Sequence, residues 1–198
     1  TTLNHVMINI GRGHQASWYS SPYPEMEAIL GSSQFPERDL FGELADALIA
    51  RDLKVLVYFS AYGVDKAYVS ASVWSKWEDY LATSGLTHNQ AVSKIIEYYS
   101  NKFGDKIDGW WFDRCGKMTQ SEKAAFANAA RSGNPDAILA FHGGFLGSPI
   151  GQATPYCDYT AGHPIPMITQ PPWGLANVSM VRDVEDGPWI GQDGQPDP

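Results

Sequence analysis

The stretch Ile107-Asp108-Gly109-Trp110-Trp111-Phe112-Asp113-Arg114 (IDGWWFDR) is the most informative part of this 198-residue sequence. The near-continuous apolar run over Ile107–Asp113 predicts a strand that is covered on both faces, as in a parallel sheet. Aspartate is a poor residue for a buried strand unless its charge has a purpose or a partner. Asp113 is therefore either a strand-end residue that caps the next loop, with Arg114 as its ion-pair partner, or a functional carboxylate.

Working outward from this stretch, apolar runs alternate with amphipathic segments along the chain. The other expected strands are Asn4–Ile10, Lys54–Ser60, Asp136–His142 and a short one at Tyr156–Thr160. The expected helices are one that opens at Pro36 and closes at Arg51–Leu53, a second at Asn89–Phe103 and a third at Gln120–Arg131. Such alternation predicts parallel strands joined by crossover helices.

Polar residues fall at or just beyond the carboxyl ends of these strands, namely His14, Ser60, Asp113 and His142. Barrels gather functional residues at that face, so the placement favours a barrel over a doubly wound sheet. A full (β/α)8 barrel takes about 250 residues, and only about five strands are evident here. We therefore expect a single α/β domain over residues 1–198, a partial or reduced (β/α)8-like TIM barrel with parallel strands and a Gly/Pro-rich segment from about Gly143.

Composition and charge exclude some classes of function. The formal net charge is −8 and no Lys/Arg cluster is present, which disfavours nucleic acid as a partner. No apolar run approaches the roughly 20 residues that span a bilayer, so we expect no membrane partner. Cys115 and Cys157 form either one disulfide or two small buried thiols. No CxxC or His-rich spacing indicates a metal site.

The aromatic residues point towards a sugar ligand. They make up 13% of the chain, with seven Trp and ten Tyr, which suits either a flat-faced ligand or a large core. Trp110 and Trp111 come shortly before Asp113 in the sequence. In a sugar site, an aromatic ring packs against the C–H face of the sugar while a carboxylate attacks the anomeric carbon. This pairing favours the functional interpretation of Asp113.

Four segments, in consistent order, carry a resemblance to a known family. Trp111-Phe112-Asp113 matches a W-F-D-G strand motif, with Arg114 in place of Gly. Upstream, Arg12–Ala16 with Trp18 and Ser20 matches K-H-H-D-G-F followed by Trp and Ser, and Phe35–Ser60 matches an R-D-L helix-and-strand unit. Downstream, Cys157–His163 matches D-Y-x-T-P-E. The sequence thus resembles the family 29 α-L-fucosidases and, more loosely, the related endo-fucanases. The family's first strand and last strands have no counterpart.

The resemblance implies a retaining exo-glycosidase with Asp113 as the nucleophile and either His163 or Glu185 as the acid/base. It implies sugar contacts from His14, and we add Trp18, Tyr58, Trp111 and His142 as candidate substrate-binding residues. It implies no cofactor and no metal, and a carbohydrate substrate such as an α-L-fucoside or a related deoxy or sulfated sugar. We also expect an extracellular or periplasmic location, which the sequence itself does not fix.

Two other functions remain compatible with the sequence. The chain is alternatively a sugar-binding or structural relic without catalysis, or another polysaccharide-active enzyme such as a lyase.

An open arc of about five parallel strands leaves exposed edges, a strong aggregation liability. We expect the Gly/Pro-rich segment after Gly143 to wrap an edge, with a homo-oligomer as the alternative.

Overall fold

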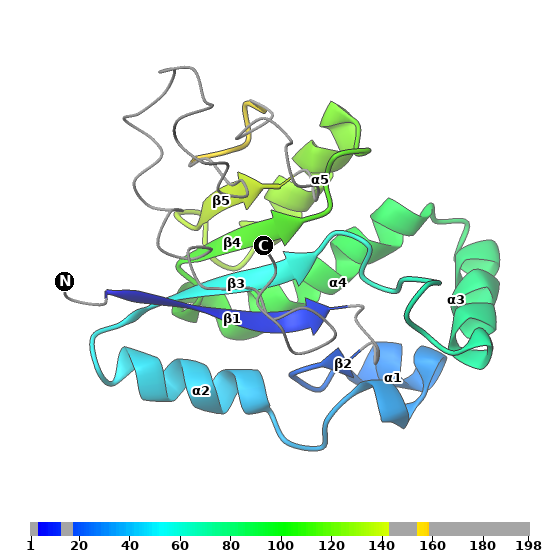
Figure 1. The fold of residues 1–198 in the computed structure, drawn as a ribbon, viewed down its shortest axis with the longest axis horizontal. Helices are drawn as coiled ribbons and strands as arrows, with labels where there is room; N and C mark the ends of the chain where they lie inside the picture. The colour runs from blue at the N-terminus through cyan, green and yellow to red at the C-terminus, as the bar shows by residue number, and fades with distance from the viewer. Residues whose placement is uncertain (1–3, 13–17, 143–153, 159–198) are drawn as a thin grey trace, which may run out of the picture.

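The computed structural model describes residues 4–12, 18–142 and 154–158. The chain alternates strands and helices as expected (Figure 1). The elements are β1 (His5–Arg12), β2 (Trp18–Tyr19), α1 (Pro24–Leu30), η1 (Ser32–Gln34), α2 (Leu40–Ile49), β3 (Lys54–Ser60), α3 (Ala71–Ser84), α4 (His88–Phe103), η2 (Gly104–Lys106), β4 (Gly109–Asp113), α5 (Gln120–Ala130) and β5 (Ile138–Phe141).

The sheet has the strand order β2-β1-β3-β4-β5. Strands β1, β3, β4 and β5 are parallel, and β2 pairs antiparallel with the end of β1. Each parallel strand lies beside the previous parallel strand in the chain, without the reversal of order that defines a doubly wound sheet. This progression is that of a (β/α)8 barrel, and the described sheet forms an arc of one, as the sequence predicted.

The two faces of the sheet differ in what covers them. Alternate strand residues face the helices and join the main core; among them are Ile8, Ile10, Val55, Val57, Phe59, Trp110, Phe112, Leu139 and Phe141. Helix α4 passes behind the strands on this side (Figure 1). The opposite face carries a smaller cluster of Trp111 and Ala140, with Met7, Tyr58 and Ile138 packed against it. In a barrel this second face is the interior one, which leads up to the catalytic rim.

Local sequence signals fix where the helices begin and end. Capping boxes open α4, through Thr87 and Gln90, and α5, through Thr119 and Glu122. Helix α3 is terminated by Gly85, the residue after its last turn, whose φ of 69° suits a residue without a side chain. Gly109 is required for a different reason: a Cβ there would lie 2.6 Å from Ile138 Cγ1, so its absence allows β4 and β5 to approach each other.

Several expectations about the elements need correction. The helix expected to open at Pro36 begins at Leu40, because the Asp39 carboxylate accepts a hydrogen bond from Gly42 N and caps it there. Helices α1 and α3 lie in stretches of the chain where the sequence analysis predicted no helix. The short strand expected at Tyr156–Thr160 is not formed over residues 156–158, and residues 159–160 lie outside the described residues.

The segment 154–158 nevertheless covers part of the β5 edge. Asp158 N donates to Leu139 O at 2.8 Å, and Leu139 N donates back to the Asp158 carboxylate at 2.7 Å. Arg131 also pairs with this carboxylate. The expected wrapping of an edge is therefore present in these residues, and the remainder of the Gly/Pro-rich segment lies outside the described residues.

Candidate active site

Asp113 is the last residue of β4 and lies opposite Ser60, the last residue of β3. Side chains alternate along a strand, so Asp113 shares the interior face with Trp111. Its side chain is only 14% exposed. The carboxylate is thus largely withdrawn from solvent at the carboxyl end of the sheet, where the sequence placed it.

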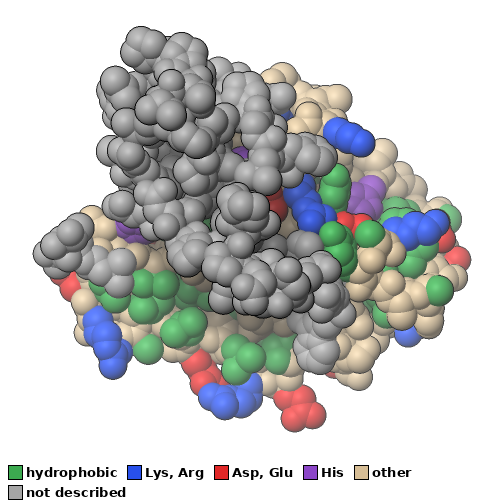
Figure 2. Space-filling view, viewed as in Figure 1, with side chains coloured by type: hydrophobic (Ala, Val, Ile, Leu, Met, Phe, Trp, Pro, Cys, Tyr) green, Lys and Arg blue, Asp and Glu red, His purple; other side chains and the backbone are tan. Residues whose placement is uncertain are grey.

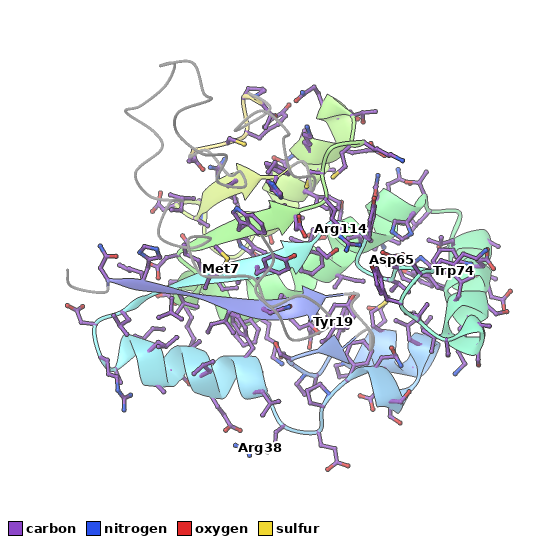
Figure 3. All side chains as sticks on the ribbon, viewed as in Figure 1. Met7, Tyr19, Arg38, Asp65, Trp74 and Arg114 are labelled. Carbon is purple, nitrogen blue, oxygen red and sulfur yellow. The ribbon has the colours of Figure 1, made fainter. Side chains whose placement is uncertain are left out.

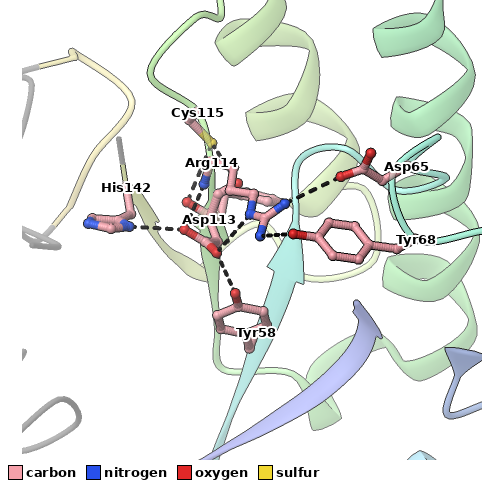
Figure 4. A network of polar contacts seen from close by, with 8 residues as sticks. Tyr58, Asp65, Tyr68, Asp113, Arg114, Cys115 and His142 are labelled. Carbon is pink, nitrogen blue, oxygen red and sulfur yellow. Dashed lines mark hydrogen bonds and ion pairs between the residues drawn. The ribbon is translucent and has the colours of Figure 1, made fainter. Parts of the chain in front are cut away.

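Both oxygens of the Asp113 carboxylate are held by donors (Figure 4). Oδ1 accepts the backbone N–H of Arg114 at 2.7 Å and lies 3.0 Å from Nδ1 of His142. Oδ2 accepts the hydroxyl of Tyr58 at 2.5 Å, and the Arg114 Nε is 3.9 Å away. An ionised carboxylate only accepts hydrogen bonds, so Nδ1 of His142 is the protonated nitrogen in this pair.

These contacts decide the charge of Asp113. Burial acts to raise the pKa of the carboxyl, but the hydrogen bonds from His142 and Tyr58, with that of the Arg114 amide, outweigh it and leave the pKa below its ordinary value. The carboxylate is therefore ionised near neutral pH although it is buried. A nucleophile requires this state, and its donors are already in place before a substrate binds.

Trp111 holds the two side-chain donors in position. The His142 ring stacks on it with centroids 5.1 Å apart, and the Tyr58 ring lies 5.0 Å from it on β3. Trp111 itself is 4% exposed. Its aromatic surface therefore packs against the residues that orient Asp113, and this contact explains why a tryptophan immediately precedes the Phe-Asp pair.

Arg114 lies at the end of β4 in an unusual conformation. Its φ is +63°, in the left-handed region that non-glycine residues rarely adopt. Its side chain reaches the loop after β3, where it donates to Tyr68 and pairs with Asp65, both at 3.3 Å (Figures 3 and 4). The guanidinium also lies against the rings of Tyr62 and Tyr68. These contacts offset the backbone strain and tie the loop to Asp113.

His88, the first residue of α4, also anchors this loop. Its Nδ1 accepts the indole N–H of Trp77 at 3.0 Å, and its Nε2 lies 2.7 Å from the carbonyl oxygen of Tyr62. An indole N–H only donates and a carbonyl only accepts, so His88 is neutral with its proton on Nε2. Burial accordingly lowers the pKa of His88, against smaller opposing effects of the Tyr62 carbonyl and Asp65.

The structure brings together four of the residues selected from the sequence: Tyr58, Trp111, Asp113 and His142. Ser60 lies on the same rim. Trp18 lies in β2, with β1 and β3 between it and β4. His14, His163 and Glu185 lie outside the described residues. Cys115 and Cys157 are both free thiols, which answers the question the sequence left open.

Sequence reasoning missed the residues that hold Arg114 and the loop after β3 in place. Asp65, Tyr68 and His88 were given no role, and Arg114 was expected only as an ion-pair partner of Asp113. Their function depends on contacts between segments some 25 to 50 positions apart, such as Arg114 with Asp65. No local motif marks such contacts, although an arginine where the resembling motif has glycine was a signal of an unusual backbone.

Two further features concern only the described residues. Over 4–12, 18–142 and 154–158, no group of three His, Cys, Asp or Glu side chains is arranged to hold a metal ion. None of the helices in that part of the chain has the length and apolar character to cross a membrane. Figure 2 shows the Lys and Arg side chains of these residues scattered singly over one face, without a basic patch there.

The fold is that of a β/α-barrel protein, and its site is a hydrogen-bonded carboxylate at the rim of the barrel. Residues 33–145, more than half of the chain, match the family of the endo-α(1,4)-fucoidanase Mef1. The chain belongs to this family. The matched range contains Tyr58, Asp113 and His142. No curated protein sequence matches the chain.

Solved structures agree on the fold. The endo-fucoidan hydrolase MfFcnA4 from glycoside hydrolase family 107 superposes with a TM-score of 0.70 at 21% identity, over 83% of this chain and 31% of its own. The endo-fucoidan hydrolase MfFcnA9 of the same family gives 0.70 at 20% identity, over 83% and 38%. A bacterial fucosidase gives 0.50 at 16% identity, over 69% and 31%. The chain thus spans about a third of the length of these proteins.

Proposed function

We propose that this chain carries the catalytic carboxylate of a glycoside hydrolase that cleaves a fucose-containing polysaccharide. The observation that carries the proposal is the frame around Asp113: a buried carboxylate at the barrel rim, kept ionised by Tyr58, His142 and the Arg114 amide. Membership of the Mef1 family and the fold shared with endo-fucoidan hydrolases support it. The family also favours endo action over the exo action expected from the resemblance to fucosidases.

The proposed reaction is a double displacement with retention of configuration. An oxygen of Asp113 attacks the anomeric carbon while the bond from that carbon to the leaving oxygen breaks, and a second group protonates the leaving oxygen. Water then displaces Asp113 from the glycosyl-enzyme, and the same second group takes the proton from the water. We assign this group to His163 or Glu185, as expected from the sequence.

Tyr58 and His142 orient the nucleophile in this reaction. They fix the carboxylate in one rotamer, so that attack requires no reorganisation of its donors. Their hydrogen bonds also stabilise the carboxylate charge, which returns when the glycosyl-enzyme breaks down. His142 is therefore a positioning residue, since its protonated nitrogen is directed at Asp113.

The test is to incubate the full chain with fucoidan and to follow the products by size and by NMR of the anomeric protons. Endo-hydrolysis gives shorter oligosaccharides from the outset, with the configuration of the cleaved linkage, and Asp113→Asn abolishes their release. Binding without release by either protein would identify a sugar-binding module instead. Products that absorb in the ultraviolet would identify a lyase, and products of inverted configuration would exclude Asp113 as a nucleophile.

A further inference from the structure

Tyr62 is an exposed aromatic side chain near the carboxyl end of the sheet. Four large apolar or aromatic side chains are exposed among the described residues, and three of them, Leu40, Leu44 and Ile49, belong to α2. The fourth is Tyr62, 36% exposed, two residues beyond the end of β3. Its position in the loop that follows the strand places it beside the site rather than on a helix surface.

The backbone of Tyr62 is fixed from two directions. His88 Nε2 donates to its carbonyl oxygen, and the Trp77 indole holds the other nitrogen of His88. The next residue, Gly63, closes a turn by donating its N–H to Ser60 O at 2.9 Å. Gly63 itself has a left-handed φ of 55°, which a residue without a side chain adopts readily. An exposed aromatic ring on a loop anchored in this way is pre-organised for binding, because little conformational entropy remains to be lost.

The ring of Tyr62 lies one side chain away from the nucleophile. The Arg114 guanidinium carbon is 5.5 Å from the ring centroid, and Arg114 Nε is 3.9 Å from the Asp113 carboxylate. The Tyr68 ring supports the same guanidinium at 5.2 Å. A sugar unit at Asp113 and another against Tyr62 would therefore be neighbouring or near-neighbouring units of one chain.

We propose that Tyr62 is the platform of a second sugar subsite, which binds a further unit of the polysaccharide next to the unit at Asp113. The inference rests on the proposed function, since it takes the ligand to be a sugar polymer. The tyrosine ring packs against the apolar C–H face of a pyranose, as aromatic rings do in sugar sites. Arg114 orients the ring, and His88 is a positioning residue for the loop that carries it. The site thereby selects oligosaccharides over a single sugar.

Calorimetric titration of the full chain tests this inference. The Asp113→Asn background prevents turnover, and the probes are a tetrasaccharide prepared from fucoidan and L-fucose. We expect Tyr62→Ala to weaken tetrasaccharide binding about ten-fold, the order of effect of losing one aromatic contact, and to leave binding of L-fucose unchanged. Tyr62→Phe keeps the ring and should retain the affinity. Leu44→Ala, which removes an exposed apolar side chain from α2, is the matched control and should change neither.

Three outcomes would overturn the inference: unchanged tetrasaccharide binding in Tyr62→Ala, an equal loss of binding in Tyr62→Phe, or no binding of the tetrasaccharide by the chain. Failure of the proposed function is a separate result. If the unmodified chain binds the tetrasaccharide but releases no products from fucoidan, the proposed hydrolysis is wrong, and the difference between the alanine and phenylalanine variants still decides whether Tyr62 forms a subsite.

Discussion

Two aspartates five residues apart, Asp108 and Asp113, lie at opposite ends of the same strand region and are held in different ways. Asp108 lies before β4, where its carboxylate accepts the backbone N–H of Val55 at 2.9 Å and pairs with the exposed Lys54 at 2.9 Å. Its own backbone is also tied into the sheet, since Asp108 N donates to Val55 O. Asp113 receives two of its hydrogen bonds from side chains, Tyr58 and His142.

The difference separates a structural carboxylate from a chemical one. The Asp108 carboxylate contacts a backbone amide and an exposed lysine of β3. These contacts link neighbouring strands, and any parallel sheet could contain them. At Asp113 a phenol and an imidazole, both packed on Trp111, are directed at a carboxylate that burial alone would push towards its neutral form. Keeping a buried carboxylate charged costs free energy, so such an arrangement is expected where the charge takes part in binding or catalysis. The two ends of the sheet thus match the division between stability and function in barrels.

Replacing each of the two carboxylates is expected to give the largest difference in activity between the two ends of the sheet. Asp113→Asn removes the nucleophile, and we expect kcat on fucoidan to fall by about three orders of magnitude or more. Asp108→Asn keeps an oxygen to accept the Val55 N–H and should leave kcat nearly unchanged. Reducing-end release and thermal unfolding are measured on both variants. A similar loss of activity in both would show that the distinction between the two ends is wrong.

A smaller effect is expected from Tyr58→Phe, which removes one donor to Asp113. A hydrogen bond to a charged group contributes about 1.5–3 kcal/mol, so we expect kcat/KM to fall by roughly ten- to a hundred-fold. The Tyr58 hydroxyl lowers the pKa of Asp113, so its removal should raise that pKa and move the acid limb of the kcat/KM profile to higher pH.

The pH profile separates this role from a purely structural one. Loss of packing would reduce activity at all pH values without moving the acid limb, and the phenylalanine ring preserves the contact with Trp111. An acid limb at the same pH in both proteins would contradict the assigned role of the hydroxyl.

At the other end of the sheet, Asp108→Ala is expected to affect stability instead of activity. It leaves the Val55 N–H without its carboxylate partner, which costs about 1–2 kcal/mol of unfolding free energy. Lys54→Met removes only the exposed partner and should have a smaller effect, because solvent screens this ion pair. Urea unfolding measures both. A larger loss from Lys54→Met than from Asp108→Ala would reverse the assigned importance of the two contacts.

The sequence predicted the strands better than the helices that lack a strong apolar stripe. The limits of β3 were predicted correctly as Lys54–Ser60, because an apolar run buried on both faces is a simple pattern. Helix α3 was missed, because only Val73 and Trp77 are buried among its fourteen residues and its polar faces resemble a loop. Its signals were a Ser70 cap and the terminal Gly85, which are short and common motifs.

The same distinction applies to the site. Asp113 and His142 were recognised because they lie at or just beyond the ends of strands, and the ends of neighbouring parallel strands meet at one rim. The support from Asp65 and His88 was not recognised, since it depends on where the loop after β3 meets α4 and Arg114. Only tertiary contact gives a histidine such as His88 its role, and its position in the sequence carries no sign of it.

The smallest effect concerns His88 and the pH dependence of stability at the rim. Burial lowers the pKa of His88 below the value of 6.5 that it has in the unfolded chain. As pH falls through 6.5, the unfolded chain takes up this proton and the folded chain does not, so stability decreases until the pH reaches the folded pKa. Well above pH 6.5 the residue is neutral in both states and contributes no slope. Protonation would also place an N–H on Nδ1 opposite the Trp77 indole N–H.

His88→Gln removes this titration while its amide offers both an acceptor and a donor. We expect the unfolding free energy of the variant, measured in urea at several pH values, to depend less on pH below 6.5 than that of the unmodified chain. Measurements at pH 8 serve as the control, because His88 is neutral there and any difference reports only altered hydrogen-bond geometry. Parallel curves for the two proteins below pH 6.5 would show that His88 does not couple protonation to folding. A flatter curve for the variant would assign this acid sensitivity to His88, the α4 residue that holds the loop carrying Tyr62 through its contact with the Tyr62 carbonyl oxygen.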